Sequence, residues 1–173
     1  MMLRIDTGLK GRLDQYIRVH YVPKRNFRKG VAGEGRYLPK DGGQSKTYTG
    51  EFDFDELIRE LGETFHEMLF RVIREKNMDE AEVYKKAHVD RRLFSKIRNN
   101  PAYHPKKNTV LAIAVALQLD LKETEELLAK AEYAFSPSSK SDLIIRFFIE
   151  NGIYDVQTIN LALYEYGQSV LGS

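Results

Sequence analysis

Apolar residues recur at intervals of three and four along most of the chain after Phe52, a spacing typical of amphipathic α-helices. The first such run is FDFDELIRELGETFHEMLFRVIREKN at 52–77. Further runs with helical spacing lie at 78–87, 91–100, 107–119, 122–131, 138–152 and 155–167. Beyond residue 50 the sequence has no strong alternating pattern of the kind that a β-strand shows. It therefore predicts an all-α protein from that point on.

Polar residues mark where several of these helices begin and end. Thr64 followed by Glu67 is a capping-box signature, which predicts a helix that starts after Thr64, and Asn77 suits a left-handed end for it. Asp79 and Asp90 stand where the N-caps of the next two helices are expected. A short carboxylate side chain at that position accepts hydrogen bonds from the free N–H groups of the first turn.

Two further helices are predicted in residues 136–173. The first ends at Gly152, and the second runs from a cap at Asp155 to a stop at Gly167. Their apolar residues are Leu143, Ile144, Phe147, Phe148, Ile149, Ile159, Leu161 and Leu163. Because both helices are too apolar to stand alone in water, this hairpin is expected either to pack on the preceding helices or to form a dimer surface.

The N-terminal residues 1–50 have a different composition from the rest of the chain. Their formal charge is +7, against −5 for the remainder, and six glycines lie between Pro23 and Gly50. The sequence predicts a poorly structured, partly disordered basic arm, with one short strand or helix around DQYIRVHYV at 14–22. Such an arm either contacts nucleic acid or packs on an acidic face of the same protein, such as the segment 51–56.

The composition argues against several classes of function. The 173 residues include no cysteine, no leader-like apolar stretch and no run near the roughly 18 apolar residues of a membrane span. A cytoplasmic protein without membrane contact is expected. The four histidines are scattered without metal-ligand spacing, and no nucleophile–base arrangement is apparent. We therefore expect no metal, no cofactor and no enzymatic activity.

The central part of the chain carries a family resemblance. It reads EVYKKAHVDRRLFSKI at 82–97, has a proline at 105, and continues as TVLAIAVALQLDLKETEELL at 109–128. Over 64–130 this pattern resembles the phage-repressor-like (Xre/Cro-type) helix-turn-helix family. The resemblance implies a five-helix bundle within a domain at 51–135, in which a second, basic helix follows a short turn.

Members of that family read DNA bases with the first residues of the second motif helix, which corresponds here to 91–100. The resemblance therefore places Arg91, Arg92, Ser95 and Lys96 at the major groove, and Arg98, Asn99, Lys106 and Lys107 near phosphates. The local chemistry agrees, because residues 91–107 contain six Lys or Arg and no carboxylate. Arginine pairs bidentately with guanine, and lysine and asparagine suit backbone contacts.

Three residues depart from the family pattern. Tyr84 stands where a small residue is usual, His88 where a glycine gives the turn its positive φ, and Glu80 where a glutamine contacts DNA. The leading hypothesis is a regulator that binds duplex DNA as a homodimer. The alternative is a non-catalytic protein-interaction module, antitoxin-like or a phage-defence accessory. In that case the basic face meets an acidic protein. A third reading gives the face no binding role, so that Arg91, Arg92, Lys96 and Arg98 are simply solvated and paired in part with Glu80 and Glu82.

Overall fold

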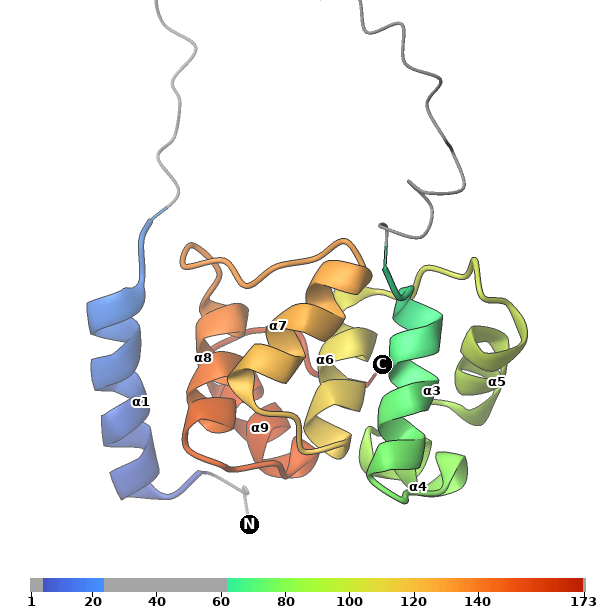
Figure 1. The fold of residues 1–173 in the computed structure, drawn as a ribbon. Helices are drawn as coiled ribbons and strands as arrows, with labels where there is room; N and C mark the ends of the chain where they lie inside the picture. Colours follow the sequence, from blue (N-terminus) through green and yellow to red (C-terminus); the bar gives the residue numbers. More distant parts are fainter. Residues whose placement is uncertain (1–4, 24–61, 173) are drawn as a thin grey trace, which may run out of the picture. The chain divides into compact units, whose positions relative to one another are not determined.

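The computed structural model describes residues 5–23 and 62–172, and all regular secondary structure within them is α-helical (Figure 1). The helices are α1 (Thr7–His20), α3 (Phe65–Glu75), α4 (Glu80–Lys86), α5 (Arg91–Asn99), α6 (Lys107–Ala116), α7 (Leu121–Lys130), α8 (Lys140–Glu150) and α9 (Val156–Glu165). The predicted all-α class is confirmed for these residues. The predictions for 24–61 lie outside the described residues.

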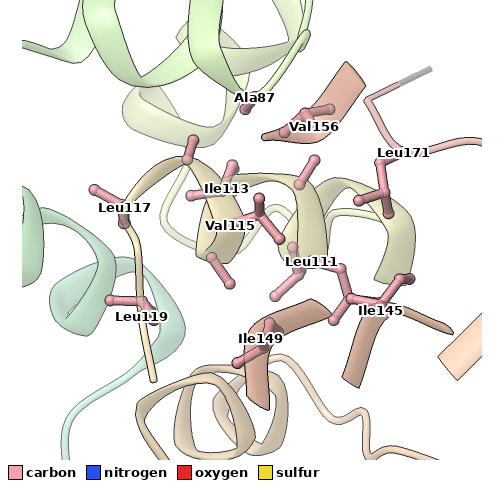
Figure 2. Packing of buried hydrophobic residues seen from close by; sticks show 14 of the residues in the cluster. Ala87, Leu111, Ile113, Val115, Leu117, Leu119, Ile145, Ile149, Val156 and Leu171 are labelled. Carbon is pink, nitrogen blue, oxygen red and sulfur yellow. The ribbon is translucent and has the colours of Figure 1, made fainter. Parts of the chain in front are cut away.

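Helix α6 is the most completely buried helix of the described chain. Its sequence is apolar on all sides, and residues 110–117 are all buried. It contacts α4, α7 and α9, and its side chains interdigitate with Ala87, Ile145 and Leu171 from other parts of the chain (Figure 2). Burial of one large aliphatic side chain contributes about 1.5–3 kcal/mol. The packing around α6 is therefore a large part of what holds the remaining helices in place.

The predicted helix boundaries are largely those of the structure. Thr64 and Glu67 form the reciprocal capping box, and the side chain of Asp90 accepts from the first turn of α5. Asn77 has a φ of 51°, which makes it the predicted left-handed end of α3. Asp79 occupies the N-cap position of α4, but its side chain makes no capping hydrogen bond.

Helix α1 lies within the region for which the sequence predicted a poorly structured arm. Asp6 caps it by accepting from the N–H groups of Gly8 and Leu9, while Leu13 and Ile17 are buried. Helix α1 packs on α8, with the Tyr16 and Phe147 rings 5.4 Å apart. The prediction of a poorly structured arm was therefore wrong for residues 7–20, whereas the short strand or helix predicted at 14–22 is a helix that begins earlier, at Thr7. Two glycines and few apolar residues weaken the helical pattern of this segment. Its helix is stabilised mainly by packing on other parts of the chain, because its intrinsic helix propensity is low.

The C-terminal hairpin packs on the other helices of the same chain. Helix α8 contacts α1, α7 and α9. Its buried apolar residues are Leu143, Ile144, Ile145, Phe147, Phe148 and Ile149. In α9, Ile159 and Leu163 are fully buried, whereas Tyr164 is 70% exposed. The apolar faces that raised the prospect of a dimer surface are thus largely covered within one chain.

The segment after α9 runs back to the junction of α4 and α5. Leu171 is buried, and the Asn160 amide bonds both its N–H (2.7 Å) and its carbonyl (3.2 Å). Gly172 has a φ of 83°, and a Cβ atom built there would lie 2.5 Å from the Ala87 carbonyl oxygen and 2.6 Å from that of His88. No side chain fits at that distance, so the backbone of residue 172 packs directly on the turn.

Candidate nucleic-acid interface

A short turn with a defined backbone joins α4 to α5. His88 has a φ of 53°, the left-handed conformation for which the sequence pattern expects a glycine. The N–H of Val89 donates to the Tyr84 carbonyl at 2.9 Å, which closes the end of α4. The Asp90 carboxylate then accepts from the N–H of Arg92 at 2.8 Å and begins α5. These bonds fix where the second helix starts.

Two aromatic contacts and one hydrogen bond hold α5 against its neighbours. Phe94 is buried, with its ring centroid 5.8 Å from that of Tyr84 and 6.2 Å from that of Phe70. The His66 Nε2 atom lies 3.0 Å from the Arg98 carbonyl oxygen, at the last turn of α5. His66, half-buried and with its ring tilted against that of Phe70, is a packing residue, as its place on an apolar helix predicts.

Three of the predicted site residues face α4. Arg91, Ser95 and Arg98 line a hollow of about 390 Å³ between the two helices, together with Asp79, Glu80, Ala81, Tyr84 and Phe94. The Arg98 guanidinium pairs with the Glu80 carboxylate at 3.1 Å. Glu82 pairs instead with Lys86 on its own helix at 2.7 Å. The pairing of the basic residues with α4 therefore involves Glu80 but not Glu82.

The other predicted residues of α5 lie on its outer face, which we define as Arg92, Lys96 and Asn99. All three are exposed, and their spacing places them on one side of the helix. The Lys96 Nζ atom lies 4.3 Å from the centroid of the Tyr103 ring. The Asn99 amide donates to the Ser95 hydroxyl at 3.1 Å, which links the outer face to the hollow. Nothing in the local sequence around Tyr103 predicts that its ring contacts Lys96.

The first turn of α5 carries two positive charges and no negative one. Arg91 and Arg92 are its first two residues, both are exposed, and the turn contains no acidic residue. Among the residues that the structure describes, neither guanidinium has a carboxylate within ion-pair distance. A helix N-terminus disfavours positive charge by about 0.3–1 kcal/mol per residue. Helices α3, α4 and α7 have glutamate in their first turns, whereas α1, α6 and α9 resemble α5 in having no acidic residue there.

Lys106 and Lys107, both predicted to lie near phosphates, have different surroundings. Lys106 is exposed at the N-cap of α6. Lys107 is only 24% exposed, and its ammonium pairs with the buried Asp142 and donates to the Ala134 carbonyl at 2.7 Å. Asp142 also accepts from the N–H of Ser136 at 2.8 Å. Lys107 thus fastens the start of α6 to α8, away from the face that Arg92 and Lys96 form.

Metal-binding clusters and membrane-spanning helices are both absent from residues 5–23 and 62–172. No group of three or more His, Asp or Glu side chains gathers there in a way that would hold a metal ion. No helix within those residues combines the length and the hydropathy required to cross a bilayer.

Comparison with known proteins gave no relative, because no family model, no curated protein and no solved structure matches this chain. The residues themselves therefore carry any assignment of function.

Proposed function

We propose that the chain is a helix-turn-helix regulator that reads the major groove of duplex DNA with α5. The observation that carries the proposal is the pair Arg91 and Arg92, exposed and without carboxylate partners among the described residues, in a first turn that disfavours positive charge. A stable fold does not need such an arrangement, whereas recognition of an anionic partner does. Local features that oppose stability concentrate at functional sites.

The dimensions of α5 suit this role. An α-helix such as α5 is about 10–12 Å across with its side chains, and the major groove, about 12 Å wide, admits a helix of that diameter. With the N-terminal end of α5 in the groove, Arg91, Arg92, Ser95 and Lys96 face base edges. Arg98, Asn99 and Lys106 then lie near the phosphates on either side. Lys107, held by Asp142, takes no part in the proposed contacts.

Selection from a pool of random duplexes tests the proposal. At about 50–100 mM salt, where phosphate contacts still bind strongly, the wild-type chain should enrich one motif. The variant with Arg91→Ala and Arg92→Ala should lose that enrichment while remaining folded by circular dichroism. A matched control removes two exposed arginines of α1, with Arg12→Ala and Arg18→Ala, and should keep it. If the wild-type chain enriches nothing, the proposal is wrong.

The form of the enriched motif also tests the expected homodimer. Two-fold symmetric regulators of this kind bind half-sites about one helical turn apart, roughly 34–36 Å between centres. An inverted repeat with that spacing supports dimeric binding, and a single short site contradicts it.

A second candidate, a non-catalytic protein-interaction module, is favoured by the Glu80–Arg98 pair and the aromatic walls of the hollow. An apolar side chain from a protein partner would pack on Tyr84 and Phe94 there, whereas Glu80 would repel a phosphate. A partner that binds the wild-type chain and the α1 control, but not the chain lacking Arg91 and Arg92, would favour this module. It would do so only if the duplex selection had failed.

A further inference from the structure

We infer that Tyr103 is a positioning residue of the DNA-reading surface, which holds the Lys96 ammonium over its ring and thereby prepares Lys96 to contact a base edge. The inference rests on the proposed function. It adds a residue from outside α5 and gives a physical reason why Lys96, which the proposed function places at a base edge, can make a defined contact there.

The contact lies well within the range of cation–π interactions. The Lys96 Nζ atom is 4.3 Å from the Tyr103 ring centroid, and such contacts are effective to about 6 Å. Lys96 is exposed, whereas Tyr103 is half-buried and packs against the edge of the core. Within the described residues, Lys96 has no carboxylate within ion-pair distance. The aromatic ring is therefore its fixed neighbour.

The loop that carries Tyr103 is itself held in place. The N–H of Tyr103 donates to the Asn100 carbonyl at 2.8 Å, and the N–H of Ala102 donates to the Asn100 side chain at 3.2 Å. Further along, Pro105 is buried, and its carbonyl accepts from the Tyr133 hydroxyl at 3.2 Å. A ring on such an anchored loop gives the Lys96 side chain a fixed support.

Support of this kind matters most for lysine. Its ammonium lies at the end of a flexible four-carbon stem, and binding must restrict the rotamers of that stem. A lysine already restricted by an aromatic ring loses less freedom when it donates to the O6 and N7 acceptors of guanine. A lysine that only neutralises phosphate charge gains little, because many of its rotamers serve equally well. The structure is thus suited to a defined contact at Lys96.

The inference predicts a selective defect in the Tyr103→Leu variant. Affinity for the selected duplex should fall about two- to fivefold, the range expected from a partly exposed cation–π contact. Affinity for an unrelated duplex and the salt dependence of binding should not change, because the number of charges is the same. Tyr103→Phe keeps the aromatic ring and should bind as the wild-type chain does.

A double-mutant cycle with Lys96→Ala separates positioning from loop stability. If Tyr103 acts through Lys96, Tyr103→Leu should cause no further loss in the Lys96→Ala chain. An equal loss in both chains would show that Tyr103 acts through the fold of the loop, and a defect in Tyr103→Phe would show that its hydroxyl matters. Either result overturns the inference.

Nuclear magnetic resonance of the free protein tests the contact without DNA. The CH₂ protons next to the Lys96 ammonium should show upfield ring-current shifts that vanish in Tyr103→Leu and persist in Tyr103→Phe. Their absence from the wild-type chain overturns the inference whatever the DNA experiments give. If the shifts are present but no motif is enriched, the proposed function fails, and with it the base contact of Lys96.

Discussion

Lys96 and Lys107 belong to the same basic run of the sequence, yet the fold gives them opposite surroundings. Lys96 is exposed on the outer face of α5 and lies over a tyrosine ring. Lys107 is mostly buried and forms an ion pair with Asp142 at the junction of α6 and α8. The basic run of the sequence therefore forms two regions in the structure. The region around Lys96 is exposed to an anionic partner, and the region around Lys107 joins α6 to α8.

The largest expected effect is on the α6–α8 junction. Asp142→Ala leaves the Lys107 ammonium without its carboxylate and should lower the free energy of unfolding by about 3 kcal/mol, because a half-buried charge loses its partner. Chemical denaturation measures this loss. The matched control, Glu82→Ala, removes one partner of an exposed pair and should cost less than about 1 kcal/mol. Equal losses in the two variants would refute a structural role for Lys107.

Loss of Arg92 on the outer face should reduce DNA binding and leave the stability of the fold intact. Arg92→Ala should weaken binding to the selected duplex by about 1–3 kcal/mol, the usual effect of losing a base contact. The free energy of unfolding of the Arg92→Ala variant should rise by about 0.3 kcal/mol, because the substitution removes a positive charge from the N-terminal turn of α5. Titration of the duplex and denaturation of the same preparation measure both quantities. A loss of stability like that of Asp142→Ala would place Arg92 in the structural region.

The smallest expected effect concerns Glu80, which lies at the boundary of the exposed region. Glu80→Gln removes a negative charge from the proposed DNA-facing side and releases Arg98, so binding should tighten by about 0.5 kcal/mol. The gain should disappear at about 1 M salt, where the screening length is near 3 Å. Weaker binding by this variant would instead indicate that the Glu80–Arg98 pair positions Arg98 for contact.

Much of the fold could be predicted from local patterns. The capping box at Thr64, the left-handed residue Asn77 and the cap at Asp90 each depend on a few neighbouring residues, and the structure has all three. Helix α1 was predicted only in part, as a short strand or helix at 14–22, because it is held by contacts distant in sequence. Its Lys10 pairs with Glu165 at 3.0 Å, and no local pattern encodes that contact.

The candidate site could be predicted less completely, for the same reason. Helical spacing alone divides α5 into a core side, a side facing α4 and an outer face. Whether a given cation is paired depends on other elements. Arg98 finds Glu80 on α4, and Lys107 finds Asp142 on α8. Asp142 lies in the first turn of α8, where an acidic residue is common, so no local pattern indicates that it is buried and paired.

Gly172 packs on the carbonyls of Ala87 and His88, so the region 64–130 does not contain every segment that its own turn contacts. It therefore cannot be transferred to another protein as a self-contained unit. The sequence predicts a repressor-like domain over that region, but the segment of chain that covers its turn comes from beyond α9. A fragment expressed without residues 168–172 would leave the α4–α5 turn exposed to solvent. In a Gly172→Ala chain, the added Cβ atom would displace the backbone of that turn. The turn before α5 and the C-terminal segment must therefore be moved together in any domain graft.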